Sequence, residues 1–224
     1  MVARAHLIRE LASGVPVRSD GFVSVGVDGV DGAGKTIFAD ALAVELRGVG
    51  RDVVRVCADD FLNARAVRCR QGRDSPVGFF EDSYDYPRLC ADVLEPFGPS
   101  GSGRYRQVAY EVATDRELDP PWRQAQVGCV LVLDGMFLHR DELAGVWDWS
   151  VFLDVPFEVT CARMAVRDGP NHDPRHPSMR RYVEGQRVYL SRCRPWQRAD
   201  ALIDNTDPDT PTLLVAREAT AEDG

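Results

Sequence analysis

Lysine is almost absent from this sequence. Of its 27 basic residues, only Lys35 is a lysine, and all the others are arginines. This scarcity excludes a GTPase that recognises guanine through an Asn-Lys-x-Asp motif, because the one lysine is not part of such a motif. Lys35 instead follows a glycine-rich stretch, which is where a phosphate-binding loop requires a lysine.

Long apolar runs are also lacking. None reaches the roughly 18 residues that a membrane span needs. Arg4, Arg9 and Glu10 interrupt the N-terminal stretch, where a signal peptide would need a continuous apolar core. We therefore expect a cytoplasmic protein with no membrane partner. The six cysteines form no CxxC pair and no metal-ligand spacing, so we expect all of them to be reduced thiols.

Acidic residues outnumber basic ones. The resulting net charge of −8 argues against a nucleic-acid partner. A chain of 224 residues, 44% of them hydrophobic, can bury one sizeable core but is short for two full domains. We therefore predict a single domain over residues 1–224. Homo-oligomerisation is left open.

The apolar pattern predicts strands that alternate with helices. Helical spacing is found in residues 3–13, 36–47, 87–97, 156–167 and 179–193. Short apolar runs typical of buried strands occupy residues 22–27, 53–57, 129–133, 150–153 and 201–203. This alternation predicts an α/β fold whose parallel sheet is covered by helices on both faces. Residues 98–120 are interpreted as a loop followed by an extended arm, and residues 168–178 as a polar loop.

Residues 29–36 form the strongest motif. Their sequence, Gly-Val-Asp-Gly-Ala-Gly-Lys-Thr, fits G-x-x-x-x-G-K-[ST] at every fixed position and lies between a predicted strand and a predicted helix. Backbone N–H groups of such a loop surround a phosphate, Lys35 would reach the β- and γ-phosphates of ATP, and Thr36 would offer its hydroxyl to Mg²⁺. The alternative is a glycine-rich turn that only joins strand to helix. The candidate ATP-binding residues are Gly29, Asp31, Gly32, Ala33, Gly34, Lys35 and Thr36.

Two other predicted strands end in carboxylates. Asp134 follows four apolar residues, the pattern that places a carboxylate beside a bound metal, and Asp59 and Asp60 follow the second strand. Because carboxyl ends of parallel strands meet at one edge, we expect all three beside the phosphate loop. Asp59 is the first candidate for the base that orients and deprotonates an acceptor hydroxyl, and Asp60 the second. Thr36, Asp59 and Asp134 are the candidate magnesium ligands. The alternatives are a helix-capping Asp134 and a solvated acidic turn at Asp59 and Asp60.

Arginines flank the predicted polar loop. Arg163 and Arg167 are four residues apart and share a helix face. They lead into residues 168–178, which contain Arg175, and two more arginines follow at 180–181. This layout is typical of a lid that closes over a nucleotide and sets guanidinium charge against the migrating phosphoryl group. The alternative is that these arginines are solvated residues of a helix surface.

Together these features resemble the uridine kinase and phosphoribulokinase group of P-loop kinases, in particular the uridine kinase-like proteins of high-G+C bacteria. The resemblance covers residues 22–206. It rests on residues 29–36, Asp59-Asp60-Phe61, Tyr84-Asp85-Tyr86-Pro87, Arg104-Tyr105-Arg106 with Tyr110, Val-Leu-Asp-Gly at 132–135, Phe-Leu-Asp-Val-Pro at 152–156, Arg163 with Arg167-Asp168, and Asp204-Asn205-Thr206.

The resemblance implies a three-layer sandwich with a parallel sheet of order 2-3-1-4-5 and a small lid at about residues 168–178. It implies that Asp59 is the base and that Asp134 helps to hold Mg²⁺. In the substrate-binding arm, at about residues 98–120, it implies that Tyr110 packs on a nucleoside base.

The resemblance also implies that Asp85 holds ribose hydroxyls and that Arg163 and Arg167 contact phosphates. The implied activity is ATP-dependent phosphorylation of a small molecule, with the 5′-hydroxyl of a nucleoside such as uridine as the first candidate acceptor. True uridine-cytidine kinases read the pyrimidine with a histidine that residues 113–116 lack. A pantothenate-like or sugar-like alcohol is therefore a second candidate, and a non-catalytic ATP-binding regulator is a third reading.

Overall fold

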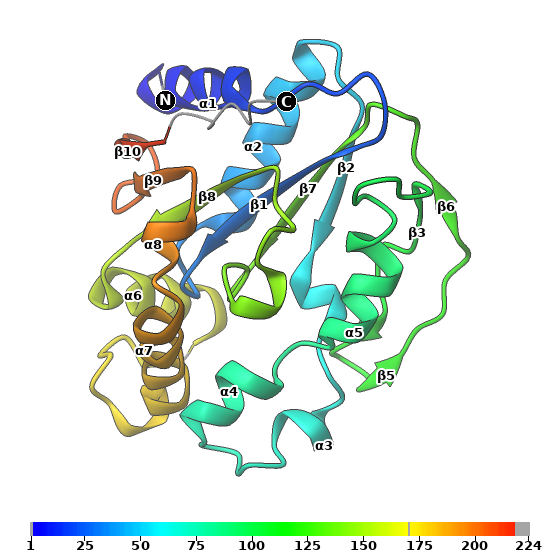
Figure 1. Ribbon diagram of the computed structural model, residues 1–224. Helices are drawn as coiled ribbons and strands as arrows, with labels where there is room; N and C mark the ends of the chain where they lie inside the picture. The colour runs from blue at the N-terminus through cyan, green and yellow to red at the C-terminus, as the bar shows by residue number, and fades with distance from the viewer. Residues whose placement is uncertain (1, 170, 218–224) are drawn as a thin grey trace.

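The computed structural model describes residues 2–169 and 171–217. In this part of the chain, six strands form a central sheet in the order β10-β9-β8-β1-β7-β2, with helices on both faces (Figure 1). The strands are β1 (Val23–Gly29), β2 (Val53–Cys57), β7 (Val130–Gly135), β8 (Trp149–Asp154), β9 (Ala201–Asp204) and β10 (Thr212–Ala216). All neighbours pair in parallel except β10, which runs antiparallel to β9.

The predicted strand order is confirmed. Numbered along the chain, the five parallel strands lie in the order 2-3-1-4-5. The prediction missed β10, which extends the sheet at its edge. Most side chains of β10 are exposed, so the strand lacks the buried apolar run by which the other strands were recognised.

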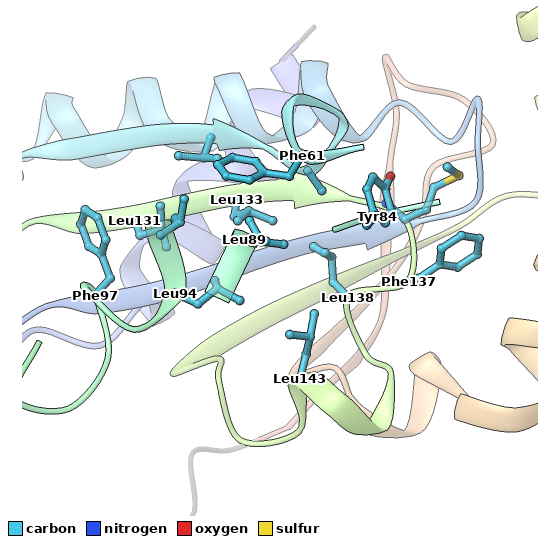
Figure 2. Close-up of a cluster of buried hydrophobic side chains, with 14 of the residues drawn as sticks. Phe61, Tyr84, Leu89, Leu94, Phe97, Leu131, Leu133, Phe137, Leu138 and Leu143 are labelled. Atoms are coloured by element: carbon cyan, nitrogen blue, oxygen red, sulfur yellow. The ribbon is translucent and has the colours of Figure 1, made fainter. Parts of the chain in front are cut away.

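Both faces of the sheet are buried because successive side chains of a strand point to opposite sides. In β7, Val130 and Val132 pack in the same cluster as Leu42, whereas Leu131 and Leu133 point into a second cluster on the other face. Figure 2 shows these two leucines among aromatic and aliphatic side chains from outside the sheet. This double burial explains why the strand is an unbroken apolar run in the sequence.

Helices complete the two outer layers. Side chains of α1 (Val2–Gly14) and α2 (Lys35–Gly48) pack in the first cluster. Side chains of α5 (Tyr86–Leu89), the π-helix η2 (Cys90–Leu94) and α7 (Arg180–Cys193) pack in the second. The predicted three-layer sandwich is thereby confirmed.

The predicted long helices are confirmed to within a few residues, including α6 (Phe157–Asp168). The helix predicted at residues 87–97 is present over residues 86–94, as α5 followed directly by the π-helix η2, and it ends a few residues earlier than predicted. Three short α-helices were missed, α3 (Arg65–Arg68), α4 (Pro76–Asp82) and α8 (Pro195–Arg198), because segments this short show no apolar periodicity. The sequence did contain an indication of α4, because Ser75 is a residue type that caps helices and a proline follows it. In the structure, Ser75 accepts a hydrogen bond from the backbone N of Gly78 at 3.0 Å.

Short elements form the arm and the remaining connections. In the arm, β3 (Arg104–Tyr105) pairs with β6 (Arg123–Gln124) and β4 (Tyr110–Glu111) pairs with β5 (Arg116–Glu117), so the predicted extended segment runs beyond residue 120. The other short helices are η1 (Ala58–Phe61), η3 (Asp141–Leu143) and η4 (Pro177–Met179).

The predicted lid, residues 168–178, includes Pro170, which lies outside the described residues. Residue 168 ends α6 and residues 177–178 begin η4, while the described residues between them, 169 and 171–176, form an irregular connection. Within the described ranges, no helix is long and apolar enough to cross a membrane.

Candidate active site

The phosphate loop joins β1 to α2, and two of its glycines adopt backbone angles that other residues rarely adopt. Gly32 has φ +79° and Gly34 has φ +90°, both left-handed. A Cβ atom on Gly32 would lie 2.6 Å from the backbone oxygen of Thr160, and one on Gly34 would lie 2.9 Å from Nδ2 of Asn205. No side chain caps the N-terminus of α2, so its first N–H groups are available to an anion.

Two buried amide side chains fix the shape of this loop. Nδ2 of Asn205, which follows β9, donates to the backbone oxygen of Ala33 at 2.7 Å. Oε1 of Gln186 in α7 accepts a hydrogen bond from the backbone N of Asp31. The loop is therefore held in place from two elements that lie far from it in the sequence.

The two arginines predicted to contact phosphate both lie at the loop. Arg163 donates to the backbone oxygens of Gly32 at 3.2 Å and Thr206 at 2.9 Å. Arg167, more exposed, lies with Nη2 3.3 Å from Oδ1 of Asp31. The guanidinium group of Arg163 is thus part of the loop's framework, whereas that of Arg167 lies at the surface beside it.

Two of the three predicted magnesium ligands, Thr36 and Asp134, are in contact at the C-terminal edge of the sheet. Oγ1 of Thr36 donates to Oδ2 of Asp134 at 2.7 Å, and Nη2 of Arg55 donates to the other oxygen of Asp134 at 2.8 Å. Asp134 is almost fully buried, and Arg55 balances its charge. Nζ of Lys35 donates to the backbone oxygen of Val30 at 2.9 Å, at the start of the same loop.

Asp59 lies in η1, directly after β2, and a tyrosine fixes its orientation. The hydroxyl of Tyr84 donates to Oδ1 of Asp59 at 2.7 Å. Burial, together with the nearby Asp59 carboxylate, raises the pKa of Tyr84 well above its ordinary value, so the phenol keeps its proton and remains the donor.

Negative charge is concentrated at this edge. Burial raises the pKa of Asp60 to about 6, and the carboxylates of Asp59 and Asp134 add to the effect. Burial next to Asp134 also raises the pKa of Cys57 to about 12, so this thiol stays neutral. A bound cation would relieve the repulsion among these carboxylates.

The oxygen donors at this edge suit Mg²⁺, which prefers carboxylate and hydroxyl oxygens. Among the described residues, no three His, Cys, Asp or Glu side chains form a metal-binding group. Mg²⁺ in phosphoryl-transfer sites uses one or two carboxylates and takes its remaining ligands from phosphates and water. Thr36 and Asp134 fit that pattern.

Two cavities adjoin the phosphate loop. The large cavity, about 870 Å³, is lined by Asp31 of the loop, Asp59, Val112 of the arm and Ser178 of η4. The small cavity, about 270 Å³, lies on the other side of the loop's glycines and is mostly apolar. Its lining includes Gly32, Gly34, Ile37, Phe38, Met164 and Pro208.

Asp85 and Tyr110, which were predicted to bind a nucleoside, form hydrogen bonds within the protein. Asp85 accepts a hydrogen bond from the backbone N of Arg88 at 3.0 Å and caps α5. Tyr110 is 4% exposed, and its hydroxyl donates to Asp115. Neither is among the described residues that line the large cavity. Their assignment to the ribose and the base of a nucleoside stays a prediction.

Comparison with known proteins identifies the fold. No family model matches the chain, and no curated protein matches it either. The structure is similar to a possible uridine kinase from Bacillus stearothermophilus, with a TM-score of 0.68, 22% identity, and coverage of 89% of this chain and 96% of the other. It is also similar to phosphoribulokinase from Rhodobacter spheroides, with a TM-score of 0.56, 17% identity, and coverage of 83% and 71%. This is a P-loop kinase fold.

A third P-loop kinase structure is similar over most of its length. D-glycerate 3-kinase from Cryptococcus neoformans has a TM-score of 0.53 and 12% identity, with coverage of 84% of this chain and 88% of the other. The predicted uridine kinase-like P-loop fold is therefore confirmed.

Several residues of this candidate site were not predicted from the sequence. Arg55 could have been recognised from the sequence, because a charged residue inside a short apolar strand needs a partner of opposite charge when the strand is buried. Tyr84 and Asn205 lie in segments that carried the resemblance, but no pattern in the sequence indicates which residues they contact. Gln186 lies in the middle of a helix, where nothing distinguished it from a surface glutamine.

Proposed function

We propose that this protein transfers the γ-phosphate of ATP to a hydroxyl group of a small molecule. The observation that carries the proposal is that one cavity is lined both by Asp31 of the phosphate loop and by Asp59. A phosphate on the loop and an alcohol in this cavity would therefore lie next to the same carboxylate.

The chain has suitable groups for each part of ATP. The uncapped N–H groups of α2 and the ammonium group of Lys35 would bind the phosphates. The small cavity, with Met164 and Pro208 in its lining, offers an apolar surface for the adenine ring. Arg163 and Arg167 contact the loop and also line this cavity, so their positive charges would attract the phosphates.

Asp59 would orient the acceptor hydroxyl and accept its proton. The hydrogen bond from Tyr84 restricts the rotation of the Asp59 carboxylate, so less freedom is lost when the acceptor binds. Thr36 and Asp134 would hold Mg²⁺, with Asp59 as a third candidate ligand. When bound, Mg²⁺ would neutralise charge that develops on the phosphate oxygens.

The acceptor proposed first from the sequence is a nucleoside with a free 5′-hydroxyl, such as uridine. The second is another alcohol of pantothenate-like or sugar-like chemistry, which is favoured by the engagement of Asp85 and Tyr110 in other contacts. In both cases the protein is a small-molecule kinase. A non-catalytic ATP-binding regulator is the alternative of a different class.

The test measures ADP formation by the full chain with ATP, Mg²⁺ and a panel of nucleosides, sugars and pantothenate. With an accepted substrate, Asp59→Asn should lower kcat by about 100- to 10,000-fold, the usual contribution of a general base. Asp20→Asn, at an exposed position before β1 and therefore at the other end of the sheet, is the matched control. ATP binding without turnover of any acceptor, unchanged in Asp59→Asn, would favour the regulator.

A further inference from the structure

The large cavity contains a cluster of arginines that the proposed chemistry does not use. Its lining includes Arg65, Arg68, Arg73 and Arg181. The first three lie between β2 and α4, and the fourth lies in the first turn of α7. Within the described part of the chain, none of these four guanidinium groups forms an ion pair with a carboxylate. Arg70, in the same segment, differs because it pairs with Asp82.

Arg181 connects two other members of this cluster through hydrogen bonds to uncharged acceptors. Its Nη1 donates to the backbone oxygen of Arg73 at 2.6 Å, and its Nη2 donates to that of Arg68 at 2.9 Å. Both acceptors are neutral carbonyls, so the positive charge is not compensated. The two bonds also tie α7 to the segment after β2, which keeps the arginines on one wall of the cavity.

Arg68 is also fixed in place. Its Nε donates to the backbone oxygen of Asn63 at 2.8 Å, and its guanidinium group lies 5.9 Å from the centre of the Tyr110 ring. The side chain of Arg65 is exposed. Its backbone N donates to Oδ1 of Asp115 at 2.8 Å, which holds the backbone of Arg65 in place. Asp74 lines the same cavity, as do Asp31 and Asp59, so its described lining contains four arginines and three aspartates.

Like charges on one wall repel each other, and a bound anion would remove that repulsion. This arrangement stands out in a chain whose net charge is −8. Among the described residues, no carboxylate forms an ion pair with these four guanidinium groups. The hydrogen bond from Tyr110 lowers the pKa of Asp115, and Arg68 and Arg65 lie close enough for their charges to add to that effect. Guanidinium groups bind phosphate and carboxylate through paired N–H groups, which suits them to an oxyanion.

We propose that the acceptor carries an oxyanion group, a phosphate or a carboxylate. The arginine wall of the large cavity, formed by Arg65, Arg68, Arg73 and Arg181, binds this group while Asp59 faces the acceptor hydroxyl. The inference rests on the proposed kinase function, because it describes the second end of the acceptor. The cavity volume of about 870 Å³ accommodates a small molecule with a hydroxyl at one end and an oxyanion at the other.

The first test compares matched compounds that keep a free hydroxyl and differ in the oxyanion. Suitable sets are glycerol with glycerate and glycerol 3-phosphate, ribose with ribose 5-phosphate, and uridine with uridine 3′-phosphate. Thermal denaturation of the full chain is measured with saturating Mg²⁺ and a non-hydrolysable ATP analogue, so that the phosphate loop is already occupied. At least one anionic compound should raise the melting temperature, while its neutral counterpart should not.

The second test uses variants of the wall. Arg68→Gln should raise KM for the anionic acceptor about ten- to 100-fold and change kcat much less, because a charge-assisted bond to the distant group is lost. Arg65→Gln should act in the same direction. Because the side chain of Arg65 is exposed, this variant should keep its stability, and thermal denaturation checks that it does. Arg192→Gln is the control, since Arg192 is an exposed residue of α7 that pairs with Glu81.

The results separate this inference from the kinase proposal. Turnover of neutral compounds that equals turnover of their anionic counterparts, with no effect of Arg68→Gln, would overturn the inference and leave the kinase proposal intact. Stabilisation by an anionic compound that is lost in Arg68→Gln, without ADP formation from any compound, would support the anion site and refute the kinase proposal. No stabilisation and no turnover with any anionic compound would overturn the inference.

Discussion

At the scale of single residues, the contact between Tyr84 and Asp59 shows how the fold prepares one side chain for chemistry. The two residues are 25 positions apart, and the hydroxyl of Tyr84 reaches Oδ1 of Asp59 at 2.7 Å. The raised pKa of Tyr84 keeps the phenol protonated, so the contact is a hydrogen bond from a neutral donor to a charged acceptor. Bonds of this kind contribute more than neutral pairs do.

We expect Tyr84→Phe to lower kcat with the accepted substrate by about tenfold, because Asp59 loses the donor that orients it. KM for ATP should stay the same, since Tyr84 does not line either cavity at the phosphate loop. The measurement is steady-state kinetics at saturating ATP. Tyr105→Phe, in the arm, where the ring packs on Phe97, is the matched control. A kcat for Tyr84→Phe equal to that of the control would show that orientation by Tyr84 is not needed.

At the scale of elements, the phosphate loop depends on the segments packed against it. Asn205 after β9, Gln186 of α7 and Arg163 of α6 each hold a backbone group of the loop. The contacts leave no room for a side chain at Gly32, where a Cβ atom would meet the backbone of α6 at 2.6 Å. A glycine is therefore required at that position by both the turn and the close approach of the helix.

Gly32→Ala should weaken ATP binding by at least about tenfold, because the left-handed backbone alone costs about 1–2 kcal/mol for a residue with a Cβ atom. Gly48→Ala is the control: this residue ends α2, has no atom within 4 Å of the added Cβ, and does not need a positive φ. It should leave ATP binding unchanged. Isothermal titration with ATP and Mg²⁺ measures both variants, and equal affinities would contradict the steric argument.

At the scale of the whole molecule, a buried polar network joins the end of β1 to elements on either side of it. Nδ1 of His139 lies 2.7 Å from Oδ2 of Asp28, and its Nε2 lies 3.0 Å from Oγ of Ser150 in β8. The hydroxyl of Tyr189 in α7 donates to the same oxygen of Asp28. Asp28 precedes Gly29, so the network fixes the point at which the phosphate loop leaves the sheet.

His139→Leu should lower the free energy of unfolding by about 3 kcal/mol, because a buried carboxylate loses one of its partners and Ser150 loses another. Urea denaturation measures the change. His172→Leu, at an exposed position in the predicted lid, should change stability by less than about 0.5 kcal/mol. Equal stability of the two variants would mean that the remaining donors to Asp28 compensate fully for the loss.

The five parallel strands and the phosphate loop could be predicted from the amino-acid sequence alone. The parallel strands are buried on both faces, so their apolar runs are visible without a structure, and the motif at residues 29–36 fixes residue types that only such a loop requires. Asp59, Asp60 and Asp134 could be placed at the same edge because each follows a strand of that sheet.

Which side chains meet across long distances in the sequence could be seen only once the elements were packed together. The partners of Asp59 and Asp134 are Tyr84 and Arg55, and neither pairing follows from spacing in the sequence. The arginine wall could not be predicted for the same reason. Arginine is common in this chain, and the four arginines of the wall come together only when α7 packs against the segment after β2. Local patterns specify elements because they act between neighbours, whereas charge complementarity in a cavity depends on how those elements pack.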